Sequence, residues 1–520
     1  MNGNLIEVLL QNAAVFPDKV ALIHQSKRCT FKELADEVKK VAEFLHEKGI
    51  GKGDRVLIFV PISLALYQII LALFYLGATA VFIDAWANRK RLSEALKLVD
   101  CKAFIGIPRS YVLQLITPEI GKIPVKLTVG IGRFKIERAL GLKYQPVAPE
   151  DTALITFTTG STSLPKAANR TFGFLWEQHL ALQEHLQLQP AETVMTTLPV
   201  FVLHNLAVGC TSVIPDADPR KPEKVDARRI AAAIKQEKVE VAIASPVFFE
   251  KLAGSPVFAG VDYLRRIFLG GAPVYPRLAR KLCAAFPNTA IEIVYGSTEA
   301  EPISFISATR LLASEMNTPG LWVGKPVSGI NVAIIEITDG PVENCEPEEF
   351  AQSRKITGEI GEICVAGPFV LQEYFNSALA WRLNKFLVGE TIWHRTGDAG
   401  YVDSENNLFL MGRVKQRLVI REDIVYVFPI ENRLLDIPGV KIGTILQVND
   451  LIHIVVELQG RKFQAKQVQA EIAALNIGYQ RLCILKKIPR DPRHNSKIDY
   501  ERLKKLLAKT DNSEKFQKAK

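Results

Sequence analysis

A strand-like stretch leads into small hydroxylated residues and a lysine, a combination that can bind phosphate. Leu154, Ile155 and Phe157 form a short apolar run that is typical of a buried strand. The residues that follow are Thr158, Thr159, Gly160, Ser161, Thr162, Ser163, Leu164, Pro165 and Lys166. Small residues let backbone N–H groups approach phosphate oxygens, hydroxyls donate further hydrogen bonds, and the lysine supplies charge. A serine- and threonine-rich surface loop is an equally good interpretation of this stretch alone, and Pro165 before the lysine excludes a Walker A loop.

Three further motifs follow in the rest of the chain. They are residues 295–299 (YGSTE), residues 394–398 (HRTGD) with Gly412-Arg413, and residues 494–499 (HNSKID). Each alone has an ordinary structural interpretation, namely a strand end with a turn, a common turn, and a loop in a lysine-rich tail. In this order, however, the four motifs resemble the signatures of the adenylate-forming enzymes, the superfamily of acyl-CoA synthetases, peptide-synthetase adenylation domains and luciferases. The resemblance covers essentially the whole chain.

The resemblance implies that the protein uses ATP to convert a carboxylic acid into an acyl-adenylate, with release of pyrophosphate. The residues that it assigns to nucleotide binding are Thr158, Thr159, Gly160, Ser161, Thr162, Lys166, Gly270, Gly271, Ala272, Pro273, Tyr295, Gly296, Ser297, Asp398 and Arg413. The loop of residues 158–166 would hold the β- and γ-phosphates, and residues 270–273 would line the adenine pocket. Tyr295 would stack on adenine, and Asp398 would accept hydrogen bonds from the ribose hydroxyls. Arg413 would support the ribose and the phosphates as a fixed cation.

The resemblance also assigns catalytic roles, in a reaction that consists of positioning and charge neutralisation. Thr298 would contact the α-phosphate, and Glu299 would bind Mg²⁺, a hard cation that prefers oxygen ligands. Lys497 would reach the active site from a mobile C-terminal domain and pair with the α-phosphate and the ring oxygen. Lysine suits this role because it carries a point charge on a flexible stem and can arrive with a moving domain.

Several residues depart from the family pattern, mainly where acyl-CoA synthetases carry out the second half-reaction. Gln416 takes the position of a hinge aspartate, and residues 421–423 (RED) replace glycines of the segment that lines the pantetheine tunnel. The sequence therefore does not favour CoA as the acceptor of the acyl group. In the phosphate loop, Ser163 and Ala167 replace glycines, and their small size preserves the character of the loop.

Two segments indicate a particular branch of the superfamily. Residues 213–226 (VIPDADPRKPEKVD) and 491–498 (DPRHNSKI) are similar to the β-lactone synthetases of bacterial long-chain olefin biosynthesis. Those enzymes adenylate a 2-alkyl-3-hydroxy fatty acid, whose own hydroxyl then closes a four-membered ring and releases AMP. A fatty-acid–CoA ligase is the alternative, and a non-catalytic nucleotide- or acyl-binding relative is a second alternative. The second is disfavoured by the presence of every charged residue assigned above.

Ring closure would need a base for the proton of the hydroxyl group, and the sequence offers His204 as the only candidate. His204 lies in the segment 198–209 (LPVFVLHNLAVG), two residues after Val202, where CoA ligases often carry a histidine. A pocket or packing residue is the other interpretation of His204, and the sequence favours it over a base.

Composition is that of a globular enzyme with two to four domains. The chain has 520 residues, of which 48% are hydrophobic and 23% are charged. Its seven cysteines are scattered without a CxxC pair, and the first residues lack a basic stretch before an apolar core, so we expect a cytoplasmic protein. The net charge of +10 is spread rather than striped and accompanies no nucleic-acid motif, so we interpret it as a solvated surface with weak attraction to ATP or to an anionic membrane surface. The oligomeric state is left open.

Strand and helix patterns alternate through most of the chain and predict a large doubly wound α/β domain in residues 1–412, with a small mobile α+β domain in residues 413–520. Thr30 and Glu33 form a capping box at the start of an amphipathic helix. The most apolar stretch, residues 55–83, is interrupted by polar residues, glycine and proline, which favours a buried strand–helix–strand unit over a membrane span. Further elements are predicted as helices near 92–99, 226–237, 275–286, 464–475 and 498–508, and strands near 102–106, 239–244, 441–447, 451–458 and 480–486.

Overall fold

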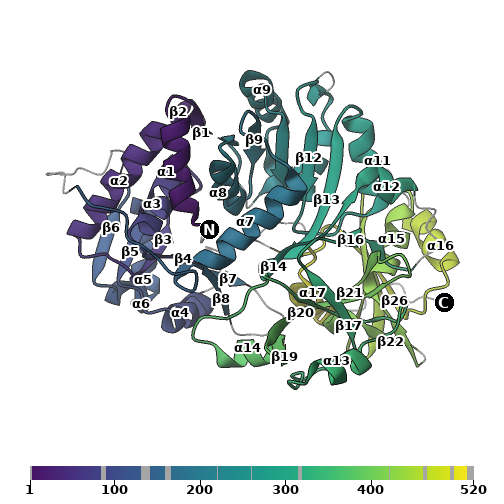
Figure 1. The fold of residues 1–520 in the computed structure, drawn as a ribbon. Coiled ribbons are helices and arrows are strands. Elements are labelled where there is room, and N and C mark those ends of the chain that lie inside the picture. The colour runs from purple at the N-terminus through teal and green to yellow at the C-terminus, as the bar shows by residue number, and fades with distance from the viewer. Residues whose placement is uncertain are drawn as a thin grey trace.

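The computed structural model describes residues 3–83, 89–130, 141–158, 165–218, 221–258, 261–313, 319–420, 422–460, 465–491 and 497–511. They form the predicted mixed α/β fold, with several sheets and a smaller C-terminal domain (Figure 1). Across these residues, no helix combines the length and apolarity that crossing a membrane requires. The mobility of the smaller domain and its boundary at Gly412-Arg413, where β21 (Leu408–Arg413) ends, stay predictions.

The largest sheet in the described residues has nine strands, in the order β16-β14-β13-β12-β11-β9-β10-β1-β2. From β1 to β13 neighbouring strands are parallel, and antiparallel strands lie at both edges. The strands are β1 (Val20–His24), β2 (Lys27–Thr30), β9 (Thr193–Thr196), β10 (Thr211–Ile214), β11 (Val241–Ala244), β12 (Arg266–Leu269), β13 (Ala290–Ser297), β14 (Ala300–Ser307) and β16 (Lys325–Pro326). Ligands of such sheets bind beyond the carboxyl ends of the parallel strands. The 295–299 motif lies at such an end, where β13 turns into β14.

A second sheet of six described strands runs in the order β6-β5-β3-β4-β7-β8. Its strands are β3 (Arg55–Phe59), β4 (Thr79–Phe82), β5 (Ala103–Gly106), β6 (Val125–Thr128), β7 (Thr152–Thr158) and β8 (Lys166–Thr171). The predicted strand–helix–strand unit is confirmed, because β3 and β4 are parallel and α3 (Leu64–Tyr75) joins them. β7 and β8 are antiparallel and flank the predicted phosphate loop.

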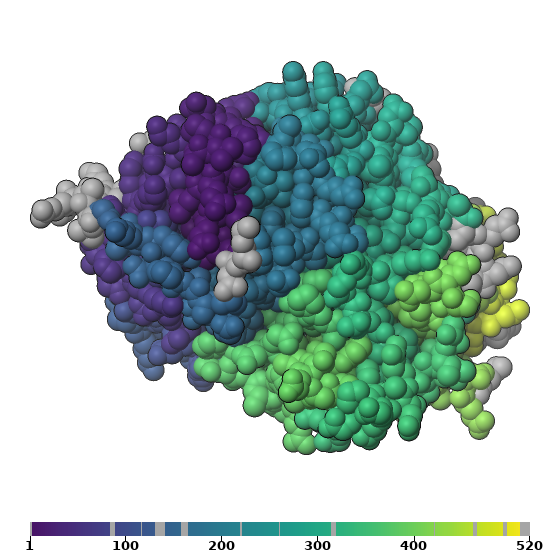
Figure 2. Space-filling view, viewed as in Figure 1, coloured from purple at the N-terminus to yellow at the C-terminus, as the bar shows by residue number. Residues whose placement is uncertain are grey.

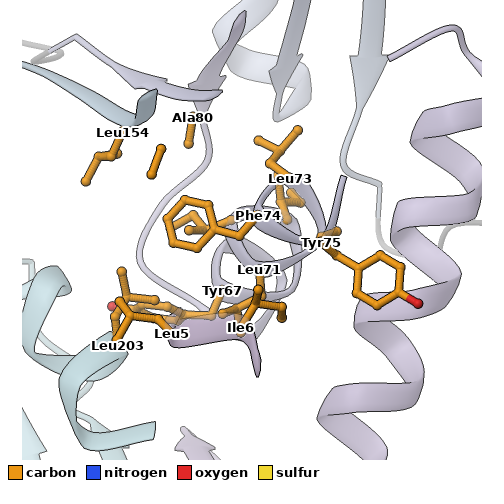
Figure 3. Close-up of a cluster of buried hydrophobic side chains, with 14 of the residues drawn as sticks. Leu5, Ile6, Tyr67, Leu71, Leu73, Phe74, Tyr75, Ala80, Leu154 and Leu203 are labelled. Carbon is orange, nitrogen blue, oxygen red and sulfur yellow. The ribbon is translucent and has the colours of Figure 1, made fainter. Parts of the chain in front are cut away.

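Helix α3 is buried because it is apolar on almost every side, which a helix facing water on one side is not. Figure 3 shows Tyr67 and Phe74 of this helix among apolar side chains that include Leu5 and Leu154. Phe74 also packs edge-on against Phe172, with ring centroids 5.3 Å apart. Burial of this helix fixes the position of the second sheet, whose strands carry the phosphate-loop segment.

Most of the remaining helices of the larger part connect and cover these two sheets, and the last two, α13 and α14, lie with the third sheet, described next (Figure 1). Helix α2 begins with the predicted capping box, in which the Thr30 hydroxyl accepts from the Glu33 N–H and the Glu33 carboxylate accepts from the Thr30 N–H. The helices are α1 (Leu5–Val15), α2 (Phe31–Glu47), α4 (Arg89–Leu98), α5 (Leu113–Ile116), α6 (Pro118–Lys122), α7 (Phe172–Leu186), α8 (Pro199–Val208), α9 (Ala227–Glu237), α10 (Pro246–Ala253), α11 (Pro276–Ala285), α12 (Ala308–Ala313), α13 (Pro347–Ser353) and α14 (Ala378–Asn384).

A third, antiparallel sheet carries the 394–398 motif. Its strands are β15 (Leu321–Trp322), β17 (Asn331–Ile335), β18 (Gly361–Ala366), β19 (Lys385–Val388), β20 (Thr391–Val402) and β21. Residues 394–398 lie within β20, and Arg413 at the end of β21 is the register partner of Asp398. In Figure 2 the green part of the chain, which includes this sheet, adjoins the teal part without a break, and the yellow C-terminal residues lie at one side.

The smaller domain contains the α+β elements that the sequence predicts. Its elements are β22 (Leu418–Ile420), β23 (Asp423–Val425), α15 (Val427–Asp436), β24 (Val440–Val448), β25 (Leu451–Leu458), α16 (Ala465–Ala474), β26 (Arg481–Leu485) and α17 (Tyr500–Asp511). It contacts the larger part through α15, where the Glu431 carboxylate accepts a hydrogen bond from Tyr275 at 2.5 Å. Within the smaller domain, Glu431 also accepts from Tyr500 at 2.8 Å. Arg277 of α11 also donates to the Leu435 carbonyl at 2.6 Å.

Candidate active site

One cavity of about 2320 Å³ collects residues from all four motifs. The predicted site residues that line it are Lys166, Gly271, Ala272, Pro273, Tyr295, Gly296, Ser297, Thr298, Glu299, Asp398, Arg413 and Lys497. They belong to the two parallel sheets, the antiparallel sheet and the smaller domain. The fold therefore brings together side chains that are more than 300 residues apart in the sequence, between Lys166 and Lys497.

Some of the predicted residues are not placed on this cavity. Residues 159–162 (Thr159, Gly160, Ser161 and Thr162) lie outside the described residues. Thr158 ends β7, where its backbone is the register partner of Lys166. Gly270 directly precedes the turn of residues 271–273 but is not among the described lining residues.

Tyr295, Asp398 and Arg413 form one connected polar group at the end of β13. The Tyr295 hydroxyl donates to Asp398 Oδ2 at 2.9 Å, and Arg413 Nη1 lies 3.3 Å from Asp398 Oδ1. Burial and the Asp398 carboxylate raise the pKa of the Tyr295 phenol well above its usual value, so the phenol remains a donor. The Asp398 charge also raises the pKa of Arg413. The carboxylate can accept hydrogen bonds, and it is fixed from both sides.

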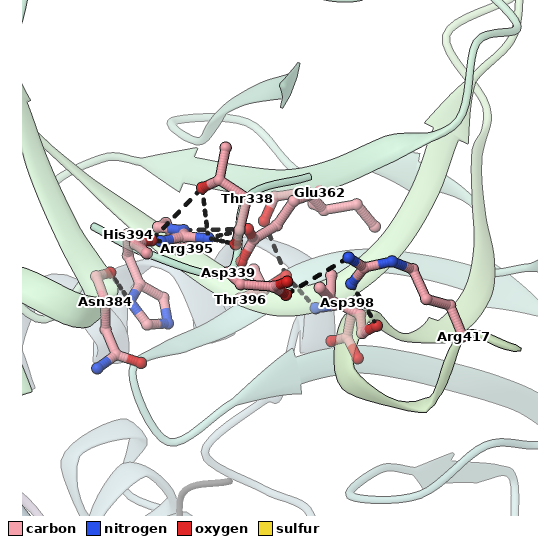
Figure 4. A network of polar contacts seen from close by, with 12 residues as sticks. Thr338, Asp339, Glu362, Asn384, His394, Arg395, Thr396, Asp398 and Arg417 are labelled. Carbon is pink, nitrogen blue, oxygen red and sulfur yellow. Dashed lines mark hydrogen bonds and ion pairs between the residues drawn. The ribbon is translucent and has the colours of Figure 1, made fainter. Parts of the chain in front are cut away.

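A buried ion pair holds the strand that presents Asp398 (Figure 4). Arg395 donates through Nε and Nη2 to Glu362 Oε2 at 3.0 and 2.6 Å, and Nη2 also donates to the Thr338 carbonyl at 2.9 Å. The Thr396 hydroxyl donates to the carbonyl of Ile363 on the neighbouring strand at 2.8 Å. Arg395 and Thr396 therefore fix β20 in the sheet, while Asp398 faces the cavity.

Glu299 lies in a cluster of charged and aromatic side chains at the wall of the cavity. Its side chain is 8% exposed, and Oε1 accepts a hydrogen bond from the Tyr374 hydroxyl at 3.0 Å. The Nζ atoms of Lys166 and Lys385 lie 5.8 and 5.5 Å from the centroid of the Tyr374 ring, within the range of cation–π contacts. Lys166 Nζ also donates to Asn384 Oδ1.

Burial and charge compete in this cluster. Burial disfavours a charged Glu299, but neighbouring side chains, His394 first and then Lys166 and Lys385, outweigh it and hold the pKa of Glu299 below its usual value. Burial lowers the pKa of Lys166, although Glu299 opposes the shift. Burial likewise lowers the pKa of Lys385 to about 7. Glu299 is thus an ionised carboxylate at neutral pH, with an adjacent cation in Lys166.

Lys497 lies on the rim of the cavity, in the smaller domain. Its side chain is exposed, and its carbonyl accepts a hydrogen bond from the Asp491 N–H at 2.8 Å. Next to it, Ile498 forms an antiparallel bridge with Arg490, whose guanidinium lies 3.6 Å from the Glu457 carboxylate. The backbone around Lys497 is thus attached to the domain, while its ammonium group is exposed at the cavity.

The segment expected to contain a hinge and a pantetheine wall divides into two parts. Gln416 lines the cavity together with its neighbours in residues 414–418. Of residues 421–423, Arg421 lies outside the described residues, whereas Glu422 and Asp423 are exposed at the turn between β22 and β23 and are not among the described lining residues.

His204 is buried behind the cavity wall, between α7 and α8. Its Nδ1 lies 2.9 Å from Nδ1 of His179, and the neighbouring Leu203, not His204, lines the cavity. Burial lowers the pKa of both imidazoles, that of His179 to about 4. This placement favours the packing role for His204 over the role of a base.

The cavity continues from the polar groups into an apolar region. Apolar lining residues are Val60, Ile62, Leu66, Ile70, Phe82, Ile83, Leu154, Phe157, Val200, Phe201 and Leu203. Most of them lie on or next to β3, α3, β4 and β7 of the second sheet, and the last three lie on α8. Such a wall suits a hydrocarbon chain, because removing apolar surface from water stabilises the bound state by about 25 cal/mol per Å².

Four residues of the site were not predicted. Arg170 and Glu301 line the cavity, while Tyr374 and Lys385 surround Glu299. Arg170 could have been predicted from its spacing to Lys166, because residues four positions apart on a strand share a face. Tyr374 and Lys385 come from the third sheet and the segment leading to it, and nothing in their local sequence indicates the contact.

Comparisons with known proteins identify the family. The family model described as AMP-binding enzyme matches residues 9–375. The olefin beta-lactone synthetase of Xanthomonas campestris pv. campestris is 30% identical over 510 residues, which cover 91% of this chain and 90% of that protein. A putative acyl–CoA ligase of Bacillus subtilis is 26% identical and covers 82% of each chain. The solved structure of O-succinylbenzoate coenzyme A synthetase from Bacillus subtilis, in complex with AMP, has a TM-score of 0.76 at 21% identity and covers 96% of this chain and 97% of that chain.

These findings confirm the predicted superfamily and the prediction that the protein is an enzyme. The matched residues 9–375 contain three of the cavity-lining groups, namely Lys166, the turn of residues 271–273, and the 295–299 motif. The relatives align beyond them, over most of the chain. The chain therefore belongs to the AMP-binding enzyme family, as an AMP-forming, acyl-adenylating enzyme.

Proposed function

We propose that this enzyme uses ATP and Mg²⁺ to adenylate a long-chain 3-hydroxy acid, and that the hydroxyl group of the acid then closes a β-lactone ring. The observation that carries the proposal is a single cavity with two different ends. One end holds Lys166, Glu299, Asp398 and Arg413, and the other is the apolar region described above. A carboxylate at the boundary would face the α-phosphorus of ATP while its hydrocarbon part lies against the apolar wall.

In the first half-reaction a carboxylate oxygen attacks the α-phosphorus, and the bond to the pyrophosphate oxygen breaks. Asp398 would bind the ribose, and the cations Lys166, Arg413 and Lys497 would offset negative charge on the phosphates. Asp398 is fixed before the substrates arrive, since it is held by Tyr295 and Arg413. Fixed charges of this kind lower the barrier without reorganising during the reaction.

The residues present fit Mg²⁺ at Glu299. Mg²⁺ is usually held by one or two carboxylates together with substrate phosphates. Glu299 offers one ionised carboxylate at the cavity wall, oriented by the Tyr374 hydroxyl. When bound, Mg²⁺ would neutralise charge on the phosphates of ATP.

In the second half-reaction the hydroxyl oxygen attacks the acyl carbon, and the bond from that carbon to the phosphate oxygen breaks. AMP leaves as a phosphate monoester, and the hydroxyl proton passes to that phosphate or to water. The attack is intramolecular, which gives a large effective concentration of the nucleophile. The relative named as a β-lactone synthetase and Gln416, which lines the cavity at the position of the hinge aspartate of acyl-CoA synthetases, support this outcome. The alternative is transfer to CoA, which the relative named as a putative acyl–CoA ligase supports.

The acceptor can be identified from the products. With ATP, Mg²⁺ and a 2-alkyl-3-hydroxy fatty acid, we expect AMP and a product lighter than the acid by one water. Addition of CoA should not accelerate turnover. Mass spectrometry of the products, with and without CoA, measures both quantities. Acyl-CoA as the main product, with saturable dependence on CoA and no lactone, would instead establish a ligase.

Asp398→Ala is expected to raise the KM for ATP by about 10- to 100-fold, because lost hydrogen bonds to a charged group cost about 1.5–3 kcal/mol. The KM for the acid should change little, since Asp398 lies at the nucleotide end of the cavity. Pyrophosphate release at varied ATP and acid concentrations separates the two constants. Asp423→Ala, at an exposed position outside the cavity lining, is the matched control. An unchanged KM for ATP would remove Asp398 from the nucleotide site.

We further propose that the reaction takes place in the cytoplasm. Each of the seven cysteines is a free thiol in the structure, which is the form that a reducing compartment maintains.

A further inference from the structure

A second pair of oppositely charged residues, Arg170 and Glu301, lines the same cavity as Lys166 and Glu299. In the register of β7 and β8, Lys166 is opposite Thr158 and Arg170 is opposite Leu154. Residues four apart on a strand share a face, so Lys166 and Arg170 both project from the cavity side of β8. A strand rises about 3.4 Å per residue, which separates the Cα atoms of Lys166 and Arg170 by about 14 Å along β8. Lys166 is thus at the phosphate-loop end of the strand, and Arg170 is near the apolar wall.

Glu301 is the acidic partner of Arg170, as Glu299 is of Lys166. Both glutamates line the cavity. Burial raises the pKa of the Glu301 carboxyl group, and the charge of Arg170 opposes this shift. Glu301 is the second residue of β14, so the two glutamates lie on either side of the point where the strand begins. Lys166 and Glu299 are thus placed to act on the phosphates, and Arg170 and Glu301 are placed to act on the acyl half of the substrate.

Both members of the second pair are held in position. Arg170 is 6% exposed, and its Nη2 donates to the carbonyl of Thr298 at 3.1 Å. Its guanidinium also lies over the Phe174 ring, 5.8 Å from the centroid. The backbone of Glu301 is fixed by Gln178, whose Nε2 donates to the Glu301 carbonyl at 3.2 Å.

A charged pair at this place needs a reason beyond stability. Replacing a buried ion pair by apolar side chains of similar volume is often neutral or stabilising, so such pairs are weak evidence for a structural role. Leu154, the register partner of Arg170, belongs to the apolar wall that suits a hydrocarbon chain. The pair is therefore suited to a polar substituent on an otherwise apolar substrate.

The structure assigns Arg170 and Glu301 to a subsite that recognises the 3-hydroxyl group of the acyl substrate. A hydroxyl group donates one hydrogen bond and can accept two. Its hydrogen would be donated to the Glu301 carboxylate, and its oxygen would accept from the Arg170 guanidinium. This inference rests on the proposed function, because it needs a substrate with a hydroxyl group near the carboxyl carbon.

The subsite would also favour ring closure. Two hydrogen bonds fix the direction of the hydroxyl oxygen relative to the acyl carbon, and a well-oriented nucleophile reacts with a high effective molarity. Arg170 also contacts the Thr298 carbonyl, in the motif expected to contact the α-phosphate. The same guanidinium therefore links the position of the hydroxyl group to that of the reacting phosphate.

The test compares two acids that differ only in the hydroxyl group, a 2-alkyl-3-hydroxy fatty acid and the corresponding 2-alkyl acid. Acid-dependent ATP–pyrophosphate exchange reports adenylation alone and does not depend on what accepts the acyl group. We expect the intact enzyme to prefer the hydroxy acid by about 10- to 100-fold in kcat/KM. This ratio corresponds to the usual free energy of hydrogen bonds to charged groups. Arg170→Met and Glu301→Gln should each reduce the preference, and the double variant R170M/E301M should abolish it while still adenylating the 2-alkyl acid.

Arg266→Met is the matched control. Arg266 forms an ion pair with Glu192, at 2.7 Å, and neither residue is among the described residues that line the cavity. We expect it to lower the melting temperature without changing the preference between the two acids.

Two outcomes would overturn the subsite while leaving the proposed function intact. In one, the intact enzyme makes lactone but adenylates both acids equally well. In the other, the Arg170 and Glu301 variants lose activity toward both acids in the same proportion, which is the result expected of a purely structural pair. Absence of exchange with either acid in the intact enzyme would instead contradict the proposed function and the subsite with it.

Discussion

Replacing Lys497 by alanine is expected to slow acyl-adenylate formation by about 10²–10³-fold, the usual effect of removing one group that stabilises charge in a transition state. Lys497 is exposed at the rim of the cavity, so its removal takes little packing from the smaller domain. Its charge would act mainly where charge develops during attack on the α-phosphorus, so kcat should fall more than the affinity for ATP. ATP–pyrophosphate exchange measures the rate, and the ATP-dependent shift in melting temperature measures binding.

Lys505→Ala provides a matched control for this experiment. Lys505 is also an exposed lysine that lines the cavity, but it lies on α17, outside the 494–499 motif. Its variant should retain nearly normal exchange. If the Lys497 variant did so too, the catalytic role of Lys497 would be wrong, and the net positive charge of the cavity rim would be sufficient for adenylation.

Elements determined by local interactions could be predicted from the sequence. The capping box at Thr30 is confirmed. It could be predicted because both of its hydrogen bonds join residues only three apart in the sequence. The strand predicted at 451–458 has the bounds of β25, and its apolar run is evident without the rest of the fold. The same holds for the unit at 55–83, where Gly77 separates helix from strand and adopts a positive φ of 66°.

Side chains that meet across different sheets could not be predicted in this way. Glu299 is recognisable by its motif, but Lys385 and Tyr374 reach it only because the third sheet lies against the first two. Their positions depend on register and packing, which the local sequence does not encode. The low pKa of Glu299 is likewise a property of that assembly.

The role of His204 also depends on packing that the local sequence does not determine. A histidine near an expected pocket can be interpreted as a base, and its distance of 2.9 Å from His179 follows only from the packing of α7 and α8. Burial of both rings, rather than their sequence context, determines that they are neutral.

Glu299→Gln is expected to reduce acyl-adenylate formation by about 10²–10³-fold and to raise the Mg²⁺ concentration needed for half-maximal rate. The substitution preserves shape, and its amide oxygen can still accept the hydrogen bond from Tyr374, so only the charge is removed. Stability should fall by about 1–3 kcal/mol, because Lys166 and Lys385 then face a neutral side chain. Exchange rates over a magnesium titration, together with thermal unfolding, measure these effects.

The control for Glu299 is Glu250→Gln, which neutralises an exposed carboxylate on α10 that also lines the cavity. Its magnesium dependence should match that of the unsubstituted enzyme. A Glu299 variant with normal activity over the whole titration would show that the carboxylate binds no catalytic metal. In that case its ionised state would serve only to balance Lys166 and Lys385, and a reduced melting temperature with an unchanged rate would be the expected signature.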